Sequence, residues 1–192
     1  MYNKSQTETR SLVLTAILTA LVIVLQYMGS FIKFGPFSIS LVLIPIVIGA
    51  SICGVKSGAW LGFVFGVFVL VSGDAAPFLA VNPLGTIITV IVKGILAGLI
   101  SGFIFNITQK VNIYFGAIAS AIVCPIVNTG IFLIGCCLFF METITTWATA
   151  AGFGSNTGAY MILVLVGGNF IFELLVNVVL SPIIVRLLKI KK

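Results

Sequence analysis

The sequence predicts an all-α integral membrane protein, with its 192 residues forming one compact bundle of six transmembrane helices. Hydrophobic residues make up 60% of the chain and charged residues only 7%, whereas soluble domains carry about 25% charged residues. The apolar runs are continuous, which favours helices over the alternating polarity of a membrane β-barrel. A chain of this length has room for about six spans of roughly 20 residues, so residues 1–192 are expected to be a single membrane domain.

Six apolar runs separated by polar residues, glycine or proline define the expected spans. They cover residues 11–29, 39–54, 57–72, 84–106, 113–141 and 158–188. The second and third runs would give helices of about 24 Å, which is short for a bilayer core of about 30 Å, so these helices are expected to be shallow, to be flanked by extended ends or to tilt very little. The fifth and sixth runs are longer than one crossing requires and should tilt or protrude.

The distribution of basic residues predicts the orientation. Six spans would place both termini and the second and fourth loops on one side of the membrane. That side holds eight of the ten basic residues: Lys4, Arg10, Lys56, Lys110, Arg186, Lys189, Lys191 and Lys192. The opposite loops hold only Lys33. The positive-inside rule therefore predicts cytoplasmic termini, and the net charge of +6 indicates orientation rather than nucleic-acid binding.

Small residues predict close contacts between helices, because close approach in lipid depends on small side chains. The third and fourth spans each carry a glycine at every fourth position: Gly58, Gly62, Gly66, Gly94, Gly98 and Gly102. Packing inside the bundle is the favoured interpretation of these stripes, and packing against another protein is the alternative. The first span contains an Ala-x-x-x-Ala step, Ala16 and Ala20, near its cytoplasmic end, which is a candidate docking surface.

Three polar side chains from three spans are predicted to lie at one level of the membrane. Lys93 lies 9 residues below the outer end of the fourth span, Asn128 lies 13 below that of the fifth, and Asn169 lies 11 below that of the sixth. These separations correspond to depths of about 13 to 20 Å. Glu173 follows Asn169 by one helical turn and shares its face.

Ionisable side chains at this depth are costly and usually face a bundle interior or a cavity. Two interpretations follow for Lys93. It forms a buried ion pair with Glu173, or it binds an anion at the floor of a cavity that opens outward, with Asn128 and Asn169 as hydrogen-bonding partners. Both amides lie beside a predicted helix irregularity, at Pro125 and at Gly167–Gly168. Helix bending without a ligand is the alternative explanation of these irregularities.

The sequence shows no pattern typical of an enzyme. It contains no histidine, no P-loop and no nucleophile elbow. The four cysteines, Cys53, Cys124, Cys136 and Cys137, fall inside apolar runs without metal-ligand spacing and are expected to be small buried hydrophobes. We therefore expect no catalytic residue, no metal and no cofactor. Uphill transport by this chain would need energy from another subunit.

These features together resemble the S components of energy-coupling factor (ECF) vitamin transporters. The resemblance covers nearly the whole chain. It is carried by the alanine step in the first span, by the stretch FGPFSISLVLIPIVIGA (34–50), by GVKSGAWLGFVFGV (54–67) and by the polar third outer segment. The order and spacing of these features support the resemblance more than any single motif does.

The resemblance implies a multi-pass protein of the plasma membrane that captures a vitamin or related micronutrient from outside. It implies docking on a membrane-embedded T subunit driven by two cytoplasmic ATPases, with Ala16 and Ala20 matching the family's docking motif. The substrate pocket of the family lies toward the outer side, formed by the first, third and fifth loops and the last three helices. The predicted level of Lys93, Asn128 and Asn169 falls in that region.

A lysine at this level favours a small anionic ligand, so pantothenate is the first expectation, riboflavin the second and another vitamin the third. Trp147 in the last outer loop is a candidate for stacking on a ring, and Glu173 is a candidate contact. Segment 72–85 is expected to form part of a lid over the pocket. Pro83 suits a helix start, and Asn82 either caps that helix or reaches a ligand. For Asp74, capping and ligand binding are alternatives to solvation, which is favoured.

A self-sufficient secondary transporter or channel is the competing class. Such folds often show internal repeats with broken helices at corresponding positions in two halves. Here Pro125 and Gly167–Gly168 both fall in the second half of the chain, and no repeat is evident. A structural membrane protein would explain the glycine stripes but not the shared polar level.

Overall fold

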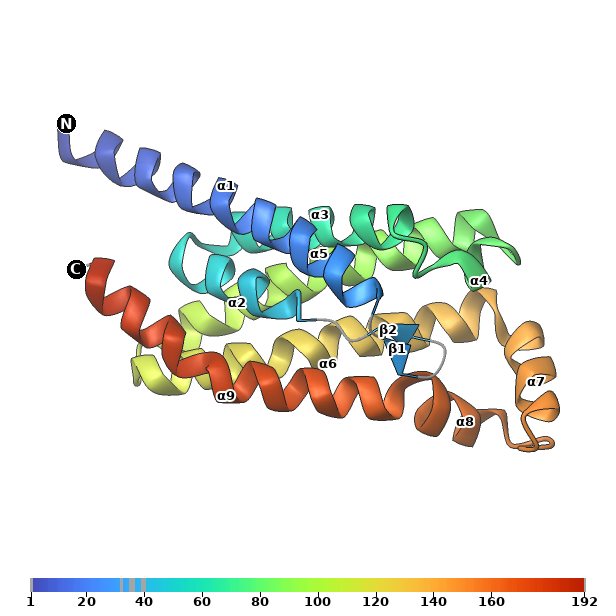
Figure 1. Cartoon of the computed structure of the whole chain (residues 1–192). Coiled ribbons are helices and arrows are strands. Elements are labelled where there is room, and N and C mark those ends of the chain that lie inside the picture. The colour runs from blue at the N-terminus through green and yellow to red at the C-terminus, as the bar shows by residue number, and fades with distance from the viewer. Residues whose placement is uncertain (1, 32, 35–36, 39–40, 192) are drawn as a thin grey trace.

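The computed structural model is a bundle of long helices that run roughly along one axis, with both termini at the same end (Figure 1). It describes the backbone of residues 2–31, 33–34, 37–38 and 41–191, and the side chains of residues 8–31 and 41–187. The helices are α1 (Tyr2–Ser30), α2 (Leu43–Ile52), α3 (Val55–Val71), α4 (Ala76–Leu79), α5 (Pro83–Thr108), α6 (Ile113–Phe139), α7 (Met141–Ala150), α8 (Thr157–Tyr160), the π-helix η1 (Met161–Gly167) and α9 (Gly168–Lys191). The helical fold class is confirmed.

Apart from turns and connections, the described residues depart from helix at one two-stranded antiparallel pair. Its strands are β1 (Lys33–Phe34) and β2 (Phe37–Ser38), with Lys33 opposite Ser38 and Phe34 opposite Phe37. The pair lies in the connection between α1 and α2.

Four helical segments are long and apolar enough to cross a membrane. They are Glu8–Ser30, Pro83–Thr108, Ile113–Phe139 and Thr157–Leu187. These segments correspond to the first, fourth, fifth and sixth spans expected from the sequence. The predicted starts of α5 and α6 are correct to within one residue, because Asn82 and Asn112 cap these helices. Asn82 accepts a hydrogen bond from the backbone N–H of Gly85 (2.9 Å), so its predicted capping role is confirmed.

The second expected span, 39–54, is longer than the helix that forms. α2 has ten residues, which gives about 15 Å of helix, and residues 39–40 lie outside the described residues. Nine of the ten residues of α2 are buried, and the helix contacts α1, α3, α5, α6 and α9. A helix that is apolar all round is typical of a buried position, which is where α2 lies. α3 has 17 residues, about 26 Å, close to the expected length.

The glycine stripes pack α3 against α5, as the favoured interpretation predicted. A methyl group added at Gly62 would collide with the backbone carbonyl of Gly94, and one added at Gly98 would collide with that of Gly58. The two backbones are therefore in direct contact, which small residues alone allow. The extensive contact between α3 and α5 is internal to the chain.

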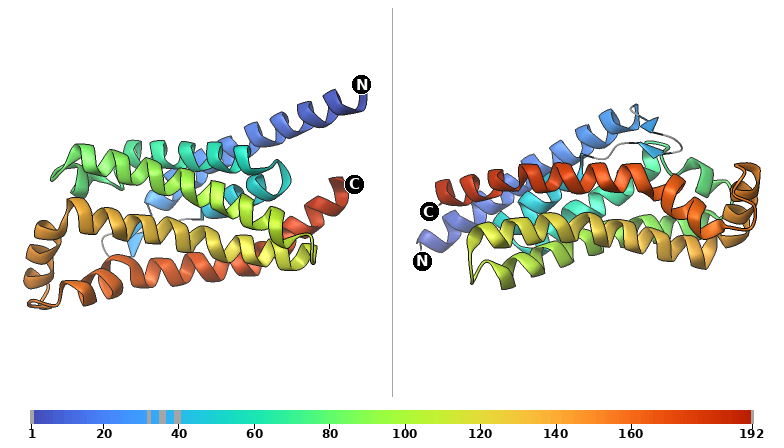
Figure 2. Two further views of the ribbon diagram at one scale, coloured as in Figure 1. Left: turned by 180° about the vertical axis from the view of Figure 1, so that it is seen from behind. Right: turned by 90° about the horizontal axis from the view of Figure 1, so that it is seen from below.

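On its other side α5 packs along α6, and α6 packs against α9 (Figure 2). Ser101 of α5 and Ser120 of α6 are fully buried, and their hydroxyl oxygens lie 2.7 Å apart. Pro125 lies inside α6, which continues through it as one helix. The irregularity predicted at Gly167–Gly168 is present as η1, whose π-helical turns end at Gly167. π-Helical turns are frequent at functional sites.

The end of the bundle opposite the termini is closed by the short helices α4, α7 and α8 (Figure 1). The sequence predicted loops for residues 72–83 and 141–158 and did not foresee these helices. α7 presents Ile144 and Ala148, one turn apart, to the protein interior, while Thr145 and Thr149 are exposed. This is an ordinary amphipathic helix, which a mostly apolar background hides in the sequence.

Candidate functional site

A cavity lies in the half of the bundle away from the termini. Its empty volume is about 630 Å³, which includes the open space at its mouth. The elements around it are the end of α1, the end of α3, α4, the start of α5, the second half of α6 and the start of α9. The polar side chains that line it are Gln26, Asp74, Thr86, Thr89, Lys93, Asn128, Asn169 and Glu173. The shared polar level expected from the sequence therefore surrounds one cavity.

Lys93 reaches this cavity between two aromatic rings. Its Nζ lies 5.5 Å from the ring centroid of Phe65 on α3 and 5.4 Å from that of Phe132 on α6. Both separations allow a cation–π attraction, which partly compensates an ammonium group removed from water. Over the described side chains, no ion pair within 4.0 Å joins Lys93 to Glu173, but the two groups lie close enough to attract each other electrostatically, so pairing with Glu173 and anion binding both stay open for Lys93. The ammonium group remains available to an anion.

Unpaired acceptors surround the lysine. The side-chain oxygens of Asn128 and Asn169 and the hydroxyl of Thr89 are buried and have no hydrogen-bond partner among the described residues. Buried polar atoms are nearly always hydrogen-bonded, so such a group calls for a ligand or water that completes it. All three side chains line the cavity. The cavity therefore combines one cation with several unused acceptor positions.

Glu173 forms the floor of the cavity together with Asn169. The Asn169 amide Nδ2 donates to Glu173 Oε1 over 3.1 Å, which confirms that the two side chains share a face of α9. Glu173 is only 2% exposed. One turn further, Asn177 Nδ2 donates to the Glu173 backbone carbonyl over 2.8 Å. The Asn169 amide thus holds the carboxylate of Glu173, whereas Asn177 contacts only its backbone.

The sequence missed several lining residues. Gln26 is buried on α1, and its amide donates to the carboxylate of Asp74. Asp74 is half-buried and lines the cavity, so the solvated position favoured for it is wrong. Thr86 and Thr89 precede Lys93 by two turns and by one turn on α5, and that spacing was the signal that could have identified them. For Gln26, the signal was a single amide in an otherwise apolar span.

Aromatic side chains form the wall toward α7. The ring of Phe78 on α4 lies 5.6 Å from that of Phe132, 5.0 Å from that of Phe140 and 5.5 Å from that of Trp147, all edge-on. Phe78, Phe132 and Phe140 line the cavity, but Trp147 stands behind Phe78. Asn82, which caps α5, is also not among the lining residues. The structure thus separates Trp147 and Asn82 from the other four predicted site residues.

A smaller recess continues from the same residues toward η1. It shares Lys93, Asn128, Phe132 and Asn169 with the main cavity. Its remaining lining residues are Thr129, Leu165, Val166 and Phe170. The irregular π-helical turn therefore borders the cavity system, beside the two unpaired amides.

The predicted docking residues lie on α1, closer to the N-terminus than Gln26, and do not line the cavity. Ala16 and Ala20 are exposed, in a row with the exposed side chains Leu12, Val24 and Met28 at four-residue spacing. The two alanines therefore form a shallow notch between bulkier side chains. For metals, a search of the described residues finds no group of three or more His, Cys, Asp or Glu side chains that could hold an ion.

Comparison with known proteins gives two matches. The family model "ECF transporter, substrate-specific component" matches residues 10–185. The Pantothenic acid transporter PanT of Lactococcus lactis subsp. cremoris (strain MG1363) is 29% identical over 188 aligned residues, which cover 88% of this chain and 89% of the relative. Both matches extend over the helices that form the cavity.

Proposed function

The chain belongs to the family of ECF transporter substrate-specific components, and from this premise we propose that it binds pantothenate in the cavity around Lys93. Members of this family are substrate-binding subunits of transporters in the plasma membrane and are not enzymes. The observation that carries the choice of ligand is the Lys93 ammonium group, which makes no ion pair within 4.0 Å among the described side chains and lines the same cavity as unpaired amide oxygens. The similarity to a pantothenic acid transporter supports the same choice.

The chemistry of pantothenate matches the polar groups of the cavity. Its carboxylate suits the Lys93 ammonium group, as a charge-assisted hydrogen bond. Its two hydroxyls and its amide N–H are donors, which suit the unpaired oxygens of Asn128 and Asn169 and the carboxylate of Glu173. Its dimethyl carbon suits the apolar wall around Phe78. We assign Asn82 and Trp147 supporting roles, since Asn82 caps α5 and Trp147 packs behind Phe78.

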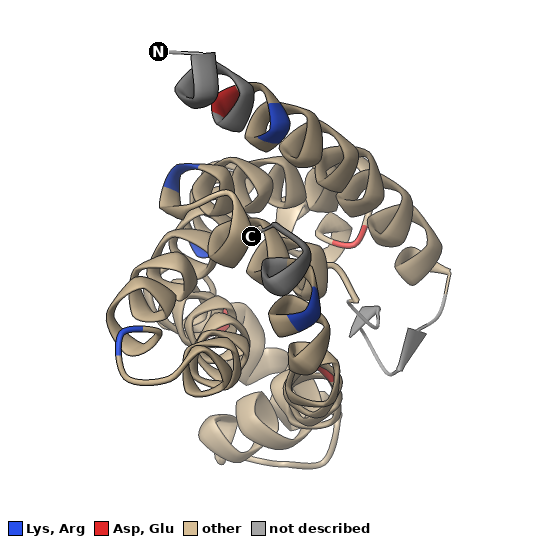
Figure 3. Ribbon diagram, turned by 90° about the vertical axis from the view of Figure 1, so that its left-hand side faces the viewer, with Lys and Arg blue, Asp and Glu red and all other residues tan. Residues whose placement is uncertain are grey.

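We further propose six membrane crossings with both termini in the cytoplasm. The distribution of positively charged residues supports this orientation. Arg10, Lys56, Lys110 and Arg186 lie near the termini or in the turns at the same end, and Figure 3 views the molecule from that end. Positive residues concentrate in cytoplasmic segments. In this orientation the cavity lies in the outer half of the bundle, on the side where a vitamin is captured, and the short helix α2 crosses only in part, inside the bundle.

The energy for uptake is proposed to come from a membrane-embedded T subunit with two cytoplasmic ATPases, docked on α1 at Ala16 and Ala20. Leucine at both positions would fill the notch. We expect that variant to lose its co-purifying partner subunits while pantothenate binding to the solitary chain stays unchanged. Partner subunits that still co-purify in normal amounts would contradict the docking role.

The ligand is tested by calorimetry on the purified chain with matched compounds. Panthenol, the alcohol that replaces the pantothenate carboxylate with a hydroxyl, is the control ligand. We expect pantothenate to bind about 10- to 100-fold more tightly than panthenol, because a hydrogen bond to a charged group contributes about 1.5–3 kcal/mol. Equal affinity for the two compounds, or binding of riboflavin alone, would refute the proposal. Uptake by the chain alone into liposomes without ATP would instead indicate a secondary transporter.

A further inference from the structure

α1 contacts the rest of the protein through a narrow stripe. Its buried side chains, among those described, are Leu18, Val22 and Gln26, each one turn from the next. Ala20 is two residues from both Leu18 and Val22, which places it about 160° around the helix from each of them. α1 therefore presents its two alanines on one face and its buried stripe on the other.

The last residue of the stripe reaches the cavity. Gln26 is 3% exposed, and its Nε2 donates to Asp74 Oδ2 and to the Ser72 hydroxyl, the latter over 3.2 Å. The Ser72 hydroxyl in turn donates to the Val69 carbonyl over 3.3 Å. Gln26 and Asp74 both line the cavity. A buried amide thus joins α1 to the turn that follows α3.

That turn carries part of the cavity wall. It passes through Gly73, whose φ of 84° is a left-handed conformation, and leads directly into α4. α4 holds Phe78 against the rings of Phe132 and Phe140. The position of the turn therefore decides where the aromatic wall stands relative to Lys93.

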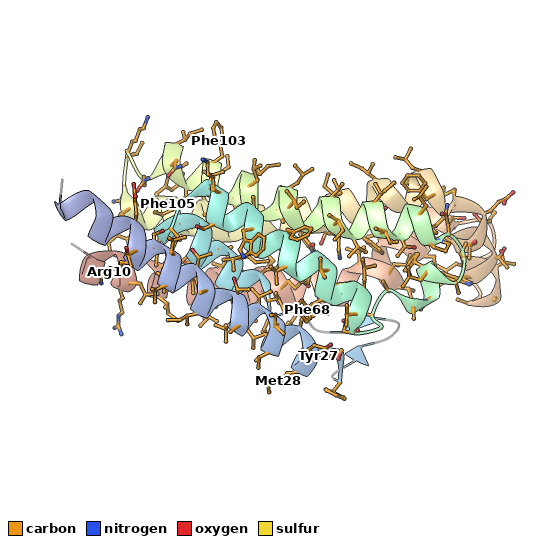
Figure 4. The ribbon with its side chains drawn as sticks, turned by 90° about the horizontal axis from the view of Figure 1, so that it is seen from above. Arg10, Tyr27, Met28, Phe68, Phe103 and Phe105 are labelled. Carbon is orange, nitrogen blue, oxygen red and sulfur yellow. The ribbon has the colours of Figure 1, made fainter. Side chains whose placement is uncertain are left out.

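A second contact between α1 and α3 lies beside the first but is apolar. The Tyr27 ring packs edge-on against that of Phe68, with centroids 5.9 Å apart, near the end of α1 (Figure 4). Tyr27 is 40% exposed, whereas Gln26 is almost fully buried. Of these two contacts, the amide is the one that reaches the turn itself, so Gln26 helps to fix the position of the turn and the aromatic pair adds packing.

We propose that Gln26 is a positioning residue that anchors the turn at residues 72–75 over the cavity, so that displacement of α1 loosens the ligand site. The amide acts through Asp74 and Ser72. Because the alanine face lies on the opposite side of the same helix, a partner docked there acts on the anchor through a rigid helix, about 9 Å along its axis from Ala20 to Gln26. The link to docking rests on the function proposed above, but the anchor itself does not.

The anchor is tested by hydrogen exchange of residues 72–82 in the ligand-free chain reconstituted in nanodiscs. Gln26→Leu removes the donor, and we expect exchange in this segment to rise about tenfold because a hydrogen bond to a charged group is lost. Gln26→Glu places two carboxylates together and should raise exchange at least as much. Adding Asp74→Asn to Gln26→Glu reverses the direction of the hydrogen bond and conserves the total charge, so exchange should return toward the wild-type rate.

Two controls separate positioning from general stability. Val22→Ala shortens a fully buried side chain on the same stripe and should not raise exchange in 72–82 more than elsewhere. Gln26→Leu with Asp74→Asn cannot form the reversed bond and should stay fast. The anchor proposal is overturned if Gln26→Leu leaves the exchange rate of residues 72–82 unchanged. It is also overturned if Gln26→Glu with Asp74→Asn exchanges as fast as Gln26→Leu with Asp74→Asn.

Pantothenate affinity provides the second measurement and distinguishes the two proposals. We expect Gln26→Leu to weaken pantothenate binding about tenfold and the reversed pair to recover most of the loss. If the wild-type chain binds no pantothenate but the exchange pattern holds, the ligand assignment fails and the anchor stands. If pantothenate binds but exchange is unaffected, the anchor fails. A docked complex with unchanged exchange in 72–82 would overturn the link to docking alone.

Discussion

The two faces of α5 differ in how closely the neighbouring helices approach them: one face touches a facing backbone, and the other borders a cavity. Toward α3, the helix presents Gly94 and Gly98, which touch the facing backbone without room for a methyl group. Toward α6 and α9 it presents Thr86, Thr89 and Lys93, which border a cavity. Both faces come from one helix, and Lys93 directly precedes Gly94 in the sequence.

This difference assigns bundle stability to one face of α5 and ligand binding to the other. In lipid, association between helices relies on close packing, so the glycine face holds the bundle together. A cavity with unpaired buried polar atoms lowers the stability of the fold, because a polar group that leaves water without gaining a hydrogen bond costs free energy. We infer that the α3–α5 contact provides the rigid support on which the adjoining side of α5 can keep an open, unpaired site. The predictions below test whether substitutions on the two faces have separable effects.

The largest effect is expected from Gly62→Ala. The added methyl group would collide with the Gly94 carbonyl, so two backbones must separate, at the upper end of the about 1–3 kcal/mol that overpacking usually costs. Gly130→Ala on α6 is the matched control, because nothing lies within 4 Å of its added methyl group. That control should be neutral or slightly stabilising, since alanine favours helix over glycine. Thermal unfolding of the purified protein measures both, and equal midpoints would contradict the tight contact.

The next effect is expected from Lys93→Met. Binding of pantothenate should weaken about 10- to 100-fold while binding of panthenol stays the same, because the lost bond is to the carboxylate. Lys56→Met, at an exposed position near the other end of the bundle, is the control and should change neither ligand. A parallel loss for both ligands would indicate that Lys93 shapes the cavity without contacting the carboxylate.

The glycine face and part of the cavity were predictable from the sequence for the same reason. Helical spacing assigns Gly58, Gly62 and Gly66 to one face, and depth along a span assigns Lys93 and Asn128 to one level. Both deductions need only the position of a residue along its own helix. The starts of α5 and α6 were predictable because Asn and Pro mark helix starts.

The rest of the site depends on which helices meet. Nothing in the sequence around Gln26 shows that the end of α1 faces the turn after α3, so its contact with Asp74 is a property of the tertiary fold. The same holds for α2, because its apolar run does not show that a helix of ten residues will be enclosed by five other helices. α4 and α7 were missed because their apolar residues blend into an apolar background.

A smaller effect is expected from Asn169→Leu, compared with Ser101→Ala. Asn169 carries a buried unpaired oxygen beside the cavity, so its loss should weaken pantothenate binding about fivefold, the value of one hydrogen bond of about 1 kcal/mol. Ser101 bonds to Ser120 inside the α5–α6 contact and does not line the cavity. Ser101→Ala should therefore lower the unfolding temperature and leave the affinity for pantothenate unchanged. Calorimetry and thermal unfolding on both variants give the test, and a reversed pattern would contradict the separation.

The smallest effect is expected from Trp147→Leu, because Trp147 acts on the cavity only through Phe78. Their edge-on ring contact, with centroids 5.5 Å apart, is worth about 0.5 kcal/mol at the low end for aromatic pairs, so affinity for pantothenate should fall about twofold. Trp60→Leu is the control, since Trp60 lies 51% exposed on α3, away from the cavity. A loss of tenfold or more in Trp147→Leu would mean that the indole contacts the ligand directly and that α7 closes over the cavity when ligand binds.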